Sequence, residues 1–403
     1  MKFLHIADLH IGKTLNAFSL LEDQEYALSQ ILEYVKLHRP GAVAIAGDVY
    51  DKQTPSPDAV RVFDGFLTGL ARLGVSVMII SGNHDSPERL GFASGIMGDS
   101  GVYLYGVFDG TMRAVTLSDE FGEIRFYMLP YIRPADVRRF YPDAAADGGD
   151  PAELEHRMGG RDNGGMIESY QDAVGAVIGA AEIDGSVRNV LIAHQFISAE
   201  GADPERSESE RETVGGTDRI DADAAGITVK FDYAALGHLH GSQRIGTERV
   251  RYAGSPLKYS FSECFHNKCA LLVELRAKGD LTVTSLPIIP LRDLRRIRGR
   301  LDDLLKVAVD EQSGNDDYLQ VVLTDDEEAF DAIGRLRAVY PNVMRLDYDN
   351  ARANAEYDVS GEAGAEYVTP LSMFEEFYAA QNGTELNGAQ LKTVADFLDA
   401  ESP

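Results

Sequence analysis

Short β-rich runs alternate with amphipathic helical patterns over the first hundred residues, and this alternation constrains the fold more than any other feature. The expected elements are strands 2–7, 42–46 and 75–80 and helices 23–38 and 57–73. Strands separated by helices pair in parallel, and the helices cover the sheet. The sequence therefore predicts an α/β fold with a mainly parallel sheet. Apolar runs at 111–117 and 124–129 predict an antiparallel hairpin that extends the sheet system.

A second group of elements follows this hairpin. A helical pattern at 167–181 precedes a strand at 189–193, and further β-rich runs cover 233–236, 250–253, 270–275 and 281–286. Two stretches break the pattern, 143–165 and 198–222, which are rich in Asp, Glu, Gly and Ser. Such composition predicts surface loops.

The composition changes near residue 287, where we expect a domain boundary. Residues Arg292–Arg300 hold five arginines in nine positions, and more than half of the net charge of −27 lies beyond residue 300. The arginines are expected either to contact backbone phosphate or to form a solvated helix face paired with Asp302 and Asp303. The predicted domains are 1–287, a smaller α+β domain at 288–347, a linker at 348–369 and a pair of amphipathic helices at 370–403.

Charge and cysteine usage limit the class of protein. A net charge of −27 opposes non-specific binding to nucleic acid or to anionic membranes. The two cysteines, Cys264 and Cys269, are too sparse for a disulfide framework, and with His266 they make a poor zinc site, so their role stays open. No secretory signal or membrane-spanning stretch is evident. We therefore expect a cytoplasmic protein.

Polar clusters stand where five of the β-rich runs end. They are Asp8-Leu9-His10, Gly47-Asp48-Val49-Tyr50-Asp51, Gly82-Asn83-His84-Asp85, His194, and Gly237-His238-Leu239-His240. Each cluster alone could be a turn, a helix cap or a hydrogen-bonded core histidine. Together they hold five of the nine histidines. Because the carboxyl ends of parallel strands meet at one edge of a sheet, we expect these clusters to converge.

The residue types in these clusters predict a two-metal centre. Carboxylate, imidazole and amide oxygen, without thiolate, favour manganese or magnesium, although iron and zinc also accept such ligands. Seven ligands are too many for one ion that keeps open positions, but they suit two ions about 3.5–4 Å apart that share a carboxylate. The predicted ligands are Asp8, His10, Asp48, Asn83, His194, His238 and His240. Such a centre attracts an anionic phosphate ester.

The motifs D-x-H, G-D-x-x-D, G-N-H-D and G-H-x-H, in this order, resemble those of the calcineurin-like metallophosphoesterases. The run 4–12, the pair His194-Gln195 and the stretch 252–256 extend the resemblance to the nuclease subunits of SbcCD-type complexes. The resemblance implies a metallophosphoesterase β-sandwich core flanked by helices, a smaller α+β capping domain that faces DNA, and a C-terminal helix-loop-helix.

The resemblance also implies roles for individual residues. Asp8, His10 and His240 would hold one ion, Asn83, His194 and His238 the other, and Asp48 would bridge them. His84 would be the catalytic residue that contacts the scissile phosphate and helps the leaving oxygen depart. Asp85 is a candidate orienting partner of His84, and Asp51 is expected to act from outside the ligand shell.

The implied function is a two-metal DNA nuclease that acts with a coiled-coil ABC ATPase, SbcC, which uses the ATP. The family resemblance implies 3′–5′ exonuclease activity on double strands, endonuclease activity on single strands and hairpins, and a homodimer within a heterotetramer. One alternative is a phosphodiesterase for small nucleotides or other phosphoesters on the same metal core. Another is a non-catalytic module, which predicts lost ligands, yet no ligand is lost.

The C-terminal helical patterns carry apolar residues at three- and four-residue spacing, as a helix that binds in a groove requires. We expect these residues to contact the coiled coil of the ATPase, or alternatively to pack on the chain's own acidic domain. They are Phe374, Phe377, Leu391, Val394 and Leu398.

Overall fold

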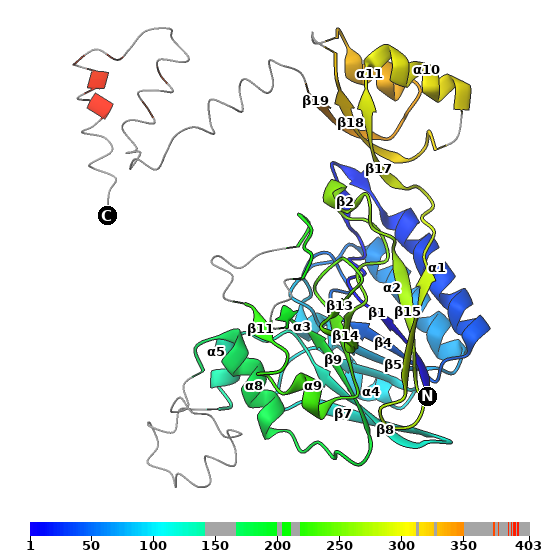
Figure 1. Cartoon of the computed structure of the whole chain (residues 1–403), viewed down its shortest axis with the longest axis vertical. Coiled ribbons are helices and arrows are strands. Elements are labelled where there is room, and N and C mark those ends of the chain that lie inside the picture. Colours follow the sequence, from blue (N-terminus) through cyan, green and yellow to red (C-terminus); the bar gives the residue numbers. More distant parts are fainter. Residues whose placement is uncertain are drawn as a thin grey trace.

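The computed structural model describes residues 1–141, 167–199, 204–210, 218–311, 314–325 and 329–349, and eight isolated positions between 374 and 394. Two six-stranded sheets form the main body (Figure 1). The first sheet has the order β16 (Leu281–Pro287), β15 (Cys269–Leu275), β1 (Lys2–Ile6), β4 (Ala42–Ala46), β5 (Ser76–Ile80) and β6 (Val102–Tyr105). The second has the order β13 (Gln243–Ile245), β14 (Thr247–Tyr252), β12 (Tyr233–Gly237), β9 (Arg188–His194), β8 (Gly122–Leu129) and β7 (Arg113–Asp119).

Each sheet has a parallel centre. Strands β1, β4, β5 and β6 pair in parallel in the first sheet, and β14, β12, β9 and β8 do so in the second. The strand β4 shows why the sheets stack, because its residues Ala42, Ala44 and Ala46 belong to the core shared with the second sheet. Val43 and Ile45 belong instead to a core on the opposite face. Burial of both faces explains the continuous apolar run in the sequence.

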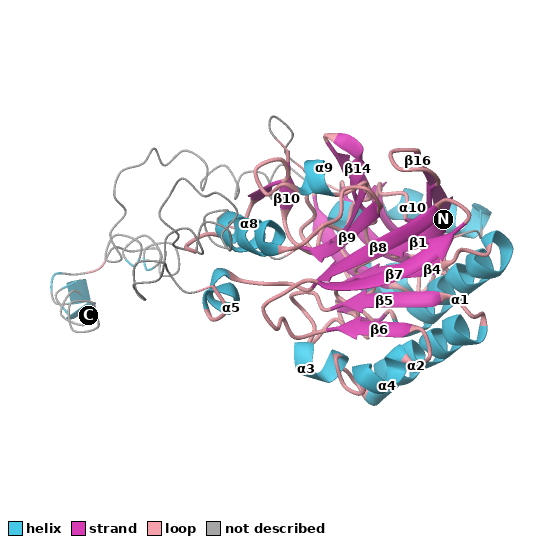
Figure 2. Ribbon diagram, turned by 90° about the horizontal axis from the view of Figure 1, so that it is seen from below, coloured by secondary structure: helices cyan, strands magenta, loops and turns pink. Residues whose placement is uncertain are grey.

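Helices close the outer faces of this sandwich (Figure 2). The helices α1 (Leu21–His38) and α2 (Pro57–Arg72) share the core of the first sheet's outer face, and Ser56 caps α2 with Pro57 at its first position. On the second sheet, α8 (Tyr170–Ala180) buries Val174 and Val177, and Ser169 and Asp172 form its capping box. The remaining elements of the main body are β2 (Thr14–Leu15), β3 (Phe18–Ser19), α3 (Pro87–Leu90), α4 (Ser94–Gly98), α5 (Pro134–Arg138), β10 (Ile197–Ser198), β11 (Ile220–Asp221), α9 (Ile227–Lys230) and the 3₁₀ turn η1 (Phe261–Glu263).

The β-sandwich core flanked by helices that the family resemblance implies is therefore confirmed. The predicted hairpin exists as β7 and β8, but it lies at the edge of the second sheet, because a local pattern sets the pairing of two strands and not the sheet that they join. The segment 198–222 is only partly a surface loop: within its described residues, β10 pairs with β11 and Ser207 is buried. The other predicted loop, 143–165, lies outside the described residues.

A second body follows residue 290, at the top of Figure 1. A three-stranded parallel sheet of β17 (Leu294–Gly299), β18 (Tyr318–Leu323) and β19 (Val343–Tyr348) packs with α10 (Leu301–Glu311) and α11 (Ala332–Arg337) around its own apolar core. Most of the arginine-rich run lies in strand β17, so the helix-face interpretation was wrong. Arg295 and Arg298 pair with Asp317 and Asp349, each at 2.7 Å, and not with Asp302 or Asp303.

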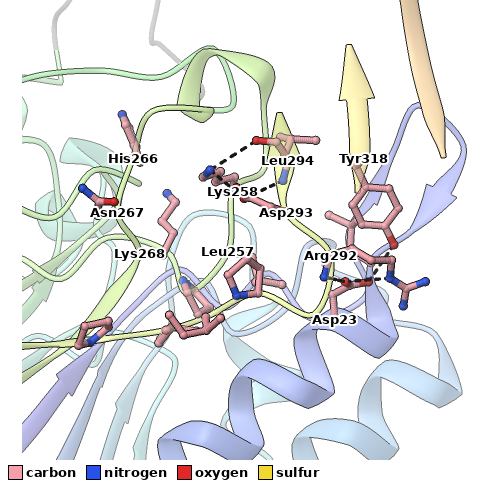
Figure 3. A pocket seen from close by; sticks show the side chains of 16 residues that line it. Asp23, Leu257, Lys258, His266, Asn267, Lys268, Arg292, Asp293, Leu294 and Tyr318 are labelled. Atoms are coloured by element: carbon pink, nitrogen blue, oxygen red, sulfur yellow. Dashed lines mark hydrogen bonds and ion pairs between the residues drawn. The ribbon is translucent and has the colours of Figure 1, made fainter. Parts of the chain in front are cut away.

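The two bodies meet where α1 begins. The hydroxyl of Tyr318 donates a hydrogen bond to Asp23 Oδ2 at 2.8 Å, and Arg292 forms an ion pair with Asp23. A cavity of about 180 Å³ lies beside this contact, between residues 256–268 of the main body and Leu294 and Tyr318 of the second (Figure 3). Among the described residues, no helix is long and apolar enough to cross a membrane.

Candidate metal centre

All seven predicted ligands converge at the carboxyl ends of the parallel strands. Asp8 follows β1, Asp48 follows β4 and Asn83 follows β5 in the first sheet, whereas His194 ends β9 and His238 follows β12 in the second. His10 and His240 stand two residues beyond Asp8 and His238. The site thus joins the same edge of both sheets, which is where parallel α/β sheets bind ligands.

The donor atoms lie close to one another in two groups. His10 Nε2 is 3.1 Å from His240 Nε2, and Asp8, His10 and His240 together offer atoms within 4.8 Å of one another. In the second group, Asn83 Oδ1 lies 3.0 Å from His194 Nε2 and 3.1 Å from His238 Nδ1. These are the two ligand sets that the family resemblance implies.

Asp48 lies between the two groups. Its Oδ2 is 3.6 Å from His10 Nε2 and 3.3 Å from His194 Nε2. Its Oδ1 accepts a hydrogen bond from the backbone N–H of His84 at 2.8 Å. This position suits a carboxylate that bridges two ions.

Hydrogen bonds on the far side of two rings determine which nitrogen faces the centre. His194 Nδ1 donates to the carbonyl oxygen of Ala46 at 2.8 Å, so in the neutral ring Nε2 is the nitrogen that carries the lone pair, and it faces Asn83 Oδ1 and Asp48. His240 Nδ1 bonds to Ser209 Oγ at 2.8 Å, which leaves its Nε2 lone pair facing His10. When the facing nitrogens carry no proton, their lone pairs repel one another unless a cation lies between them, so this donor set fits divalent ions.

Burial favours the neutral, metal-binding form of three of the four histidines. Burial lowers the pKa of His10 and His240 and lowers that of His238 to about 3, so these rings are neutral, as a ligand must be. For His194 burial acts in the same direction, but the charge of Asp48 outweighs it and raises the pKa to about 9. Burial opposes ionisation of Asp48 as well, yet the charge of His194 holds the pKa of Asp48 well below its usual range.

The backbone is strained at the proposed ligands. Nine non-glycine residues of the described chain have positive φ, and four of them are Asp8 (52°), His10 (44°), Asp48 (48°) and His238 (103°). Such conformations cost about 1–3 kcal/mol each and persist where the surroundings enforce them. Because nearly half of these positive-φ residues lie at the site, the geometry of the site, and not the stability of the fold, accounts for their conformations.

Glycines in the motifs allow the loops that carry the ligands to approach one another closely. A Cβ at Gly82 would lie 2.1 Å from Asp48 Oδ1, and one at Gly237 would lie 1.9 Å from the carbonyl oxygen of Ala46. Close packing between loops therefore requires the glycines that precede Asn83 and His238.

Replacement of the first of these glycines gives a testable prediction. Gly82→Ala is expected to displace the Asp48 carboxylate and to weaken Mn²⁺ binding at least tenfold, measured by calorimetric titration. Gly65→Ala is the matched control, because Gly65 lies in the exposed interior of α2 with open space around it. The control should bind Mn²⁺ normally and gain about 0.5–1 kcal/mol in free energy of unfolding. Equal Mn²⁺ affinity in the two variants would contradict the prediction.

His84 lies at the rim of the site. Its ring is 4.8 Å from that of His10 and perpendicular to it, and its Nδ1 bonds to the backbone oxygen of Asp51 at 3.1 Å. It also lies near enough to His10 and Asp48 to belong to a third candidate metal group. His84, Asn83 and His238 are half-buried, whereas the other proposed ligands are buried, so the site opens on this side.

Asp85 and Asp51 lie outside the two ligand groups and contact the loops or side chains that carry the ligands. The Asp85 carboxylate accepts hydrogen bonds from the backbone N–H groups of Val49, Tyr50 and Gly82, and thus joins the Asp48 and Asn83 loops instead of bonding to the ring of His84. Asp51 Oδ1 lies 3.7 Å from His10 Nδ1 and forms an ion pair with Lys13 at 2.8 Å.

Sequence reasoning missed several residues that hold the ligands. Gln24 on α1 donates to the backbone oxygen of His10 at 2.7 Å, and Ser209, Glu210, Glu263 and Lys268 surround His240. Ser209 and Glu210 lie in a segment predicted as a surface loop. No local pattern marks these residues, since their partners lie 14 to 31 positions away in the chain.

The proposed partner-binding residues are only partly within the described chain. Phe374 is exposed at 40%, and Leu391 and Val394 are half-buried; all three are helical. Phe377 and Leu398 lie outside the described residues.

Comparisons with known proteins agree with the geometry. A family model described as calcineurin-like phosphoesterase matches residues 1–241, and one described as Type 5 capsule protein repressor C-terminal domain matches residues 290–382. The D subunit of nuclease SbcCD from Staphylococcus epidermidis is 31% identical over 405 residues, which cover 99% of this chain and 98% of that protein.

Two solved structures show weaker likeness. A dimetal phosphatase from Danio rerio is 13% identical with a TM-score of 0.39, covering 72% of this chain and 96% of its own. The protein TT1561 of Thermus thermophilus is 14% identical with a TM-score of 0.38, covering 70% of this chain and 98% of its own. The sequence relationships decide the family: the chain belongs to the calcineurin-like phosphoesterases and, within them, to the family of the nuclease component of SbcCD.

Proposed function

We propose that this protein is the two-metal DNA nuclease subunit of an SbcCD-type complex. The observation that carries the proposal is the convergence of seven oxygen and nitrogen donors from both sheets at one open edge. The relative that matches nearly the whole chain is a nuclease subunit, which supports a nucleic acid as the substrate. A metal-dependent phosphoesterase is the enzyme class that both observations share.

In this proposal Asp8, His10 and His240 hold one divalent ion, Asn83, His194 and His238 hold the other, and Asp48 contacts both. Manganese suits this mixture of imidazole, carboxylate and amide, and magnesium remains the alternative. When bound, the ions supply Lewis-acid activation of water and of the phosphodiester.

The chain's own residues supply orientation and proton transfer. His84 stands at the open rim of the site. Its Nδ1 donates to the backbone oxygen of Asp51, and this hydrogen bond to the loop fixes the direction in which Nε2 points. A protonated Nε2 in this place would donate to the leaving 3′ oxygen. Asp85 maintains this geometry because it joins the loops that carry Asp48 and Asn83.

The proposal also includes specific nuclease activities. They are ATP-dependent 3′–5′ exonuclease activity on double strands and endonuclease activity on hairpins and single strands, in DNA repair, recombination and replication in the cytoplasm. An SbcC-type ATPase would use the ATP and provide much of the DNA-binding surface, because this chain carries a net charge of −27. Because Arg295 and Arg298 form ion pairs with aspartates, we do not propose that β17 contacts DNA.

We propose four functional regions, namely the nuclease domain 1–287, the capping domain 288–347, the linker 348–369 and the partner-binding helix-loop-helix 370–403. The separate apolar core of the second body supports the capping domain.

A direct test compares two substrates. With Mn²⁺, the protein should cleave a DNA hairpin, and the ATPase partner with ATP should extend cleavage into duplex ends. A cyclic nucleotide should be hydrolysed at least tenfold more slowly. Faster hydrolysis of the cyclic nucleotide would instead favour the small-molecule phosphodiesterase, and no cleavage of either substrate would refute both functions.

A homodimer through helices of the nuclease domain is a further part of the proposal. Phe92, just before α4, is 80% exposed, and Ile96, within α4, is 77% exposed. Val60 on α2 is 43% exposed. A contact between two protomers would bury exposed apolar side chains of this kind. Ile96→Glu is therefore expected to convert the dimer to a monomer in light scattering, whereas Leu37→Glu, at an exposed position on α1, should not. A monomeric wild-type protein would contradict this prediction.

Truncation after Asp349 tests the partner-binding region. Strand β19 ends at Tyr348, so the shortened chain keeps every described strand and helix of both bodies. It should retain Mn²⁺-dependent cleavage of single strands within about twofold, but it should lose binding to the ATPase in a pull-down. Co-purification of the ATPase with the truncated chain would assign the contact elsewhere.

A further inference from the structure

His240 is held on the side that faces away from the proposed ions by a buried ion pair. Its Nδ1 lies 2.8 Å from Ser209 Oγ and 3.3 Å from Glu263 Oε1, and the serine hydroxyl donates to the same carboxylate. Glu263 Oε2 accepts a hydrogen bond from Lys268 Nζ. Glu263 has no exposed surface and Lys268 is 8% exposed. An ion pair buried this completely must be compensated by hydrogen bonds, and this one is.

The backbone of the same histidine is fixed as well. Lys268 Nζ donates to the carbonyl oxygen of His240 at 2.9 Å, and Glu210 Oε1 accepts from its N–H at 2.7 Å. Lys268 also donates to Ser255 Oγ at 2.9 Å, so its three N–H groups are all used. The ring and the main chain of one proposed ligand are thus held by a single network.

We propose that Glu263 is a positioning residue for the ion held by Asp8, His10 and His240, with Lys268 as its counter-ion. The inference rests on the proposed function, since it concerns the same metal centre. A carboxylate beside Nδ1–H fixes the tautomer that leaves Nε2 free for the ion, and it makes the ring a stronger donor.

Within the described part of the chain, the other histidine ligands have no equivalent support. His194 Nδ1 donates to a neutral carbonyl, that of Ala46. Among the described residues, His10 Nδ1 has no hydrogen-bond partner, and the Asp51 carboxylate lies 3.7 Å from it. His238 turns its Nδ1 toward Asn83. The Glu263 carboxylate therefore strengthens one of the two ion sites, and removing its charge should weaken that site selectively.

The network also reaches the boundary between the two bodies. Lys268 lines the cavity that Leu294 and Tyr318 of the capping sheet close from the other side (Figure 3). The ion pair thus connects the wall of this interdomain cavity to a ligand of one ion.

The test is Mn²⁺ binding to Glu263→Gln in the full chain. Glutamine keeps the size of the side chain and removes its charge, so one of the two sites should weaken ten- to a hundredfold in calorimetric titration. Electron paramagnetic resonance should then show isolated Mn²⁺ at stoichiometries where the wild type shows a coupled pair. Glu248→Gln is the matched control, since Glu248 pairs with Arg244 and Arg251 at the surface. The control should match the wild type in both measurements.

A second variant separates positioning from stability. Glu263→Gln combined with Lys268→Met leaves no buried unpaired charge, so it should melt closer to the wild type than Glu263→Gln while the same single site stays weak. Unchanged affinity at both sites, equal weakening of both sites, or recovery of the weakened site in the double variant would each overturn the positioning role. If the wild type binds no pair of ions, the proposed function fails first and the inference fails with it.

Discussion

Asp48→Asn is expected to reduce bound Mn²⁺ from two ions per chain to one or none and to abolish DNA cleavage. Its carboxylate lies between His10 and His194, so its charge acts on both proposed ions. Two unit charges about 4 Å apart interact by about 4 kcal/mol at an effective dielectric constant near 20, so loss of the carboxylate charge should lower the affinity for a divalent ion by at least about a thousandfold. Asparagine has the same shape, and the backbone hydrogen bond from His10 to residue 48 remains.

Elemental analysis after desalting, together with cleavage of a DNA hairpin, measures this effect. Asp64→Asn on the exposed face of α2 serves as the control for removing one negative charge and should behave as the wild type. Retention of two tightly bound ions by Asp48→Asn would show that Asp48 does not bridge them.

His84→Gln should lower the rate of DNA cleavage by about 10²–10⁴-fold, the usual contribution of a general acid, while both ions stay bound. The ions stay because His84 holds Asp48 through its backbone N–H, which the substitution preserves. The proton donor is lost because an amide does not protonate near neutral pH. Single-turnover cleavage and elemental analysis of the same sample measure the two effects separately.

His38→Gln at the end of α1 is the control for loss of a half-buried histidine away from the site, and its cleavage rate should not change. Loss of one ion from His84→Gln would make His84 a ligand, in agreement with the group that it forms with His10 and Asp48. Unchanged cleavage would exclude His84 from the chemistry.

The proposed ligands could be predicted because the signal is local. Asp8, Asp48 and Asn83 each follow a short apolar strand, and the parallel pairing of β1, β4 and β5 brings their loops together. The division into two sheets could not be predicted from the alternation of strands and helices, because β8 and β9 look the same in sequence whichever sheet they join.

The arginine-rich run shows a different reason for error. Its spacing of charges fits one face of a helix, but pairing of β17 with β18 and ion pairs to Asp317 and Asp349 favour a strand. These partners are separated from the arginines by 22 and 51 residues. Contacts over such separations outweigh local propensity, which contributes less than about 1 kcal/mol per residue.

By itself, the sequence determined the family, the identity of the candidate ligands and the strand ends that carry them, since each of these depends on residue types within a few positions. Only the tertiary structure decided which nitrogen of His194 and of His240 faces the centre, and that Glu263 and Lys268 support His240. The reason is physical: the tautomer and orientation of a buried ring depend on hydrogen bonds from segments that folding alone brings within 3 Å.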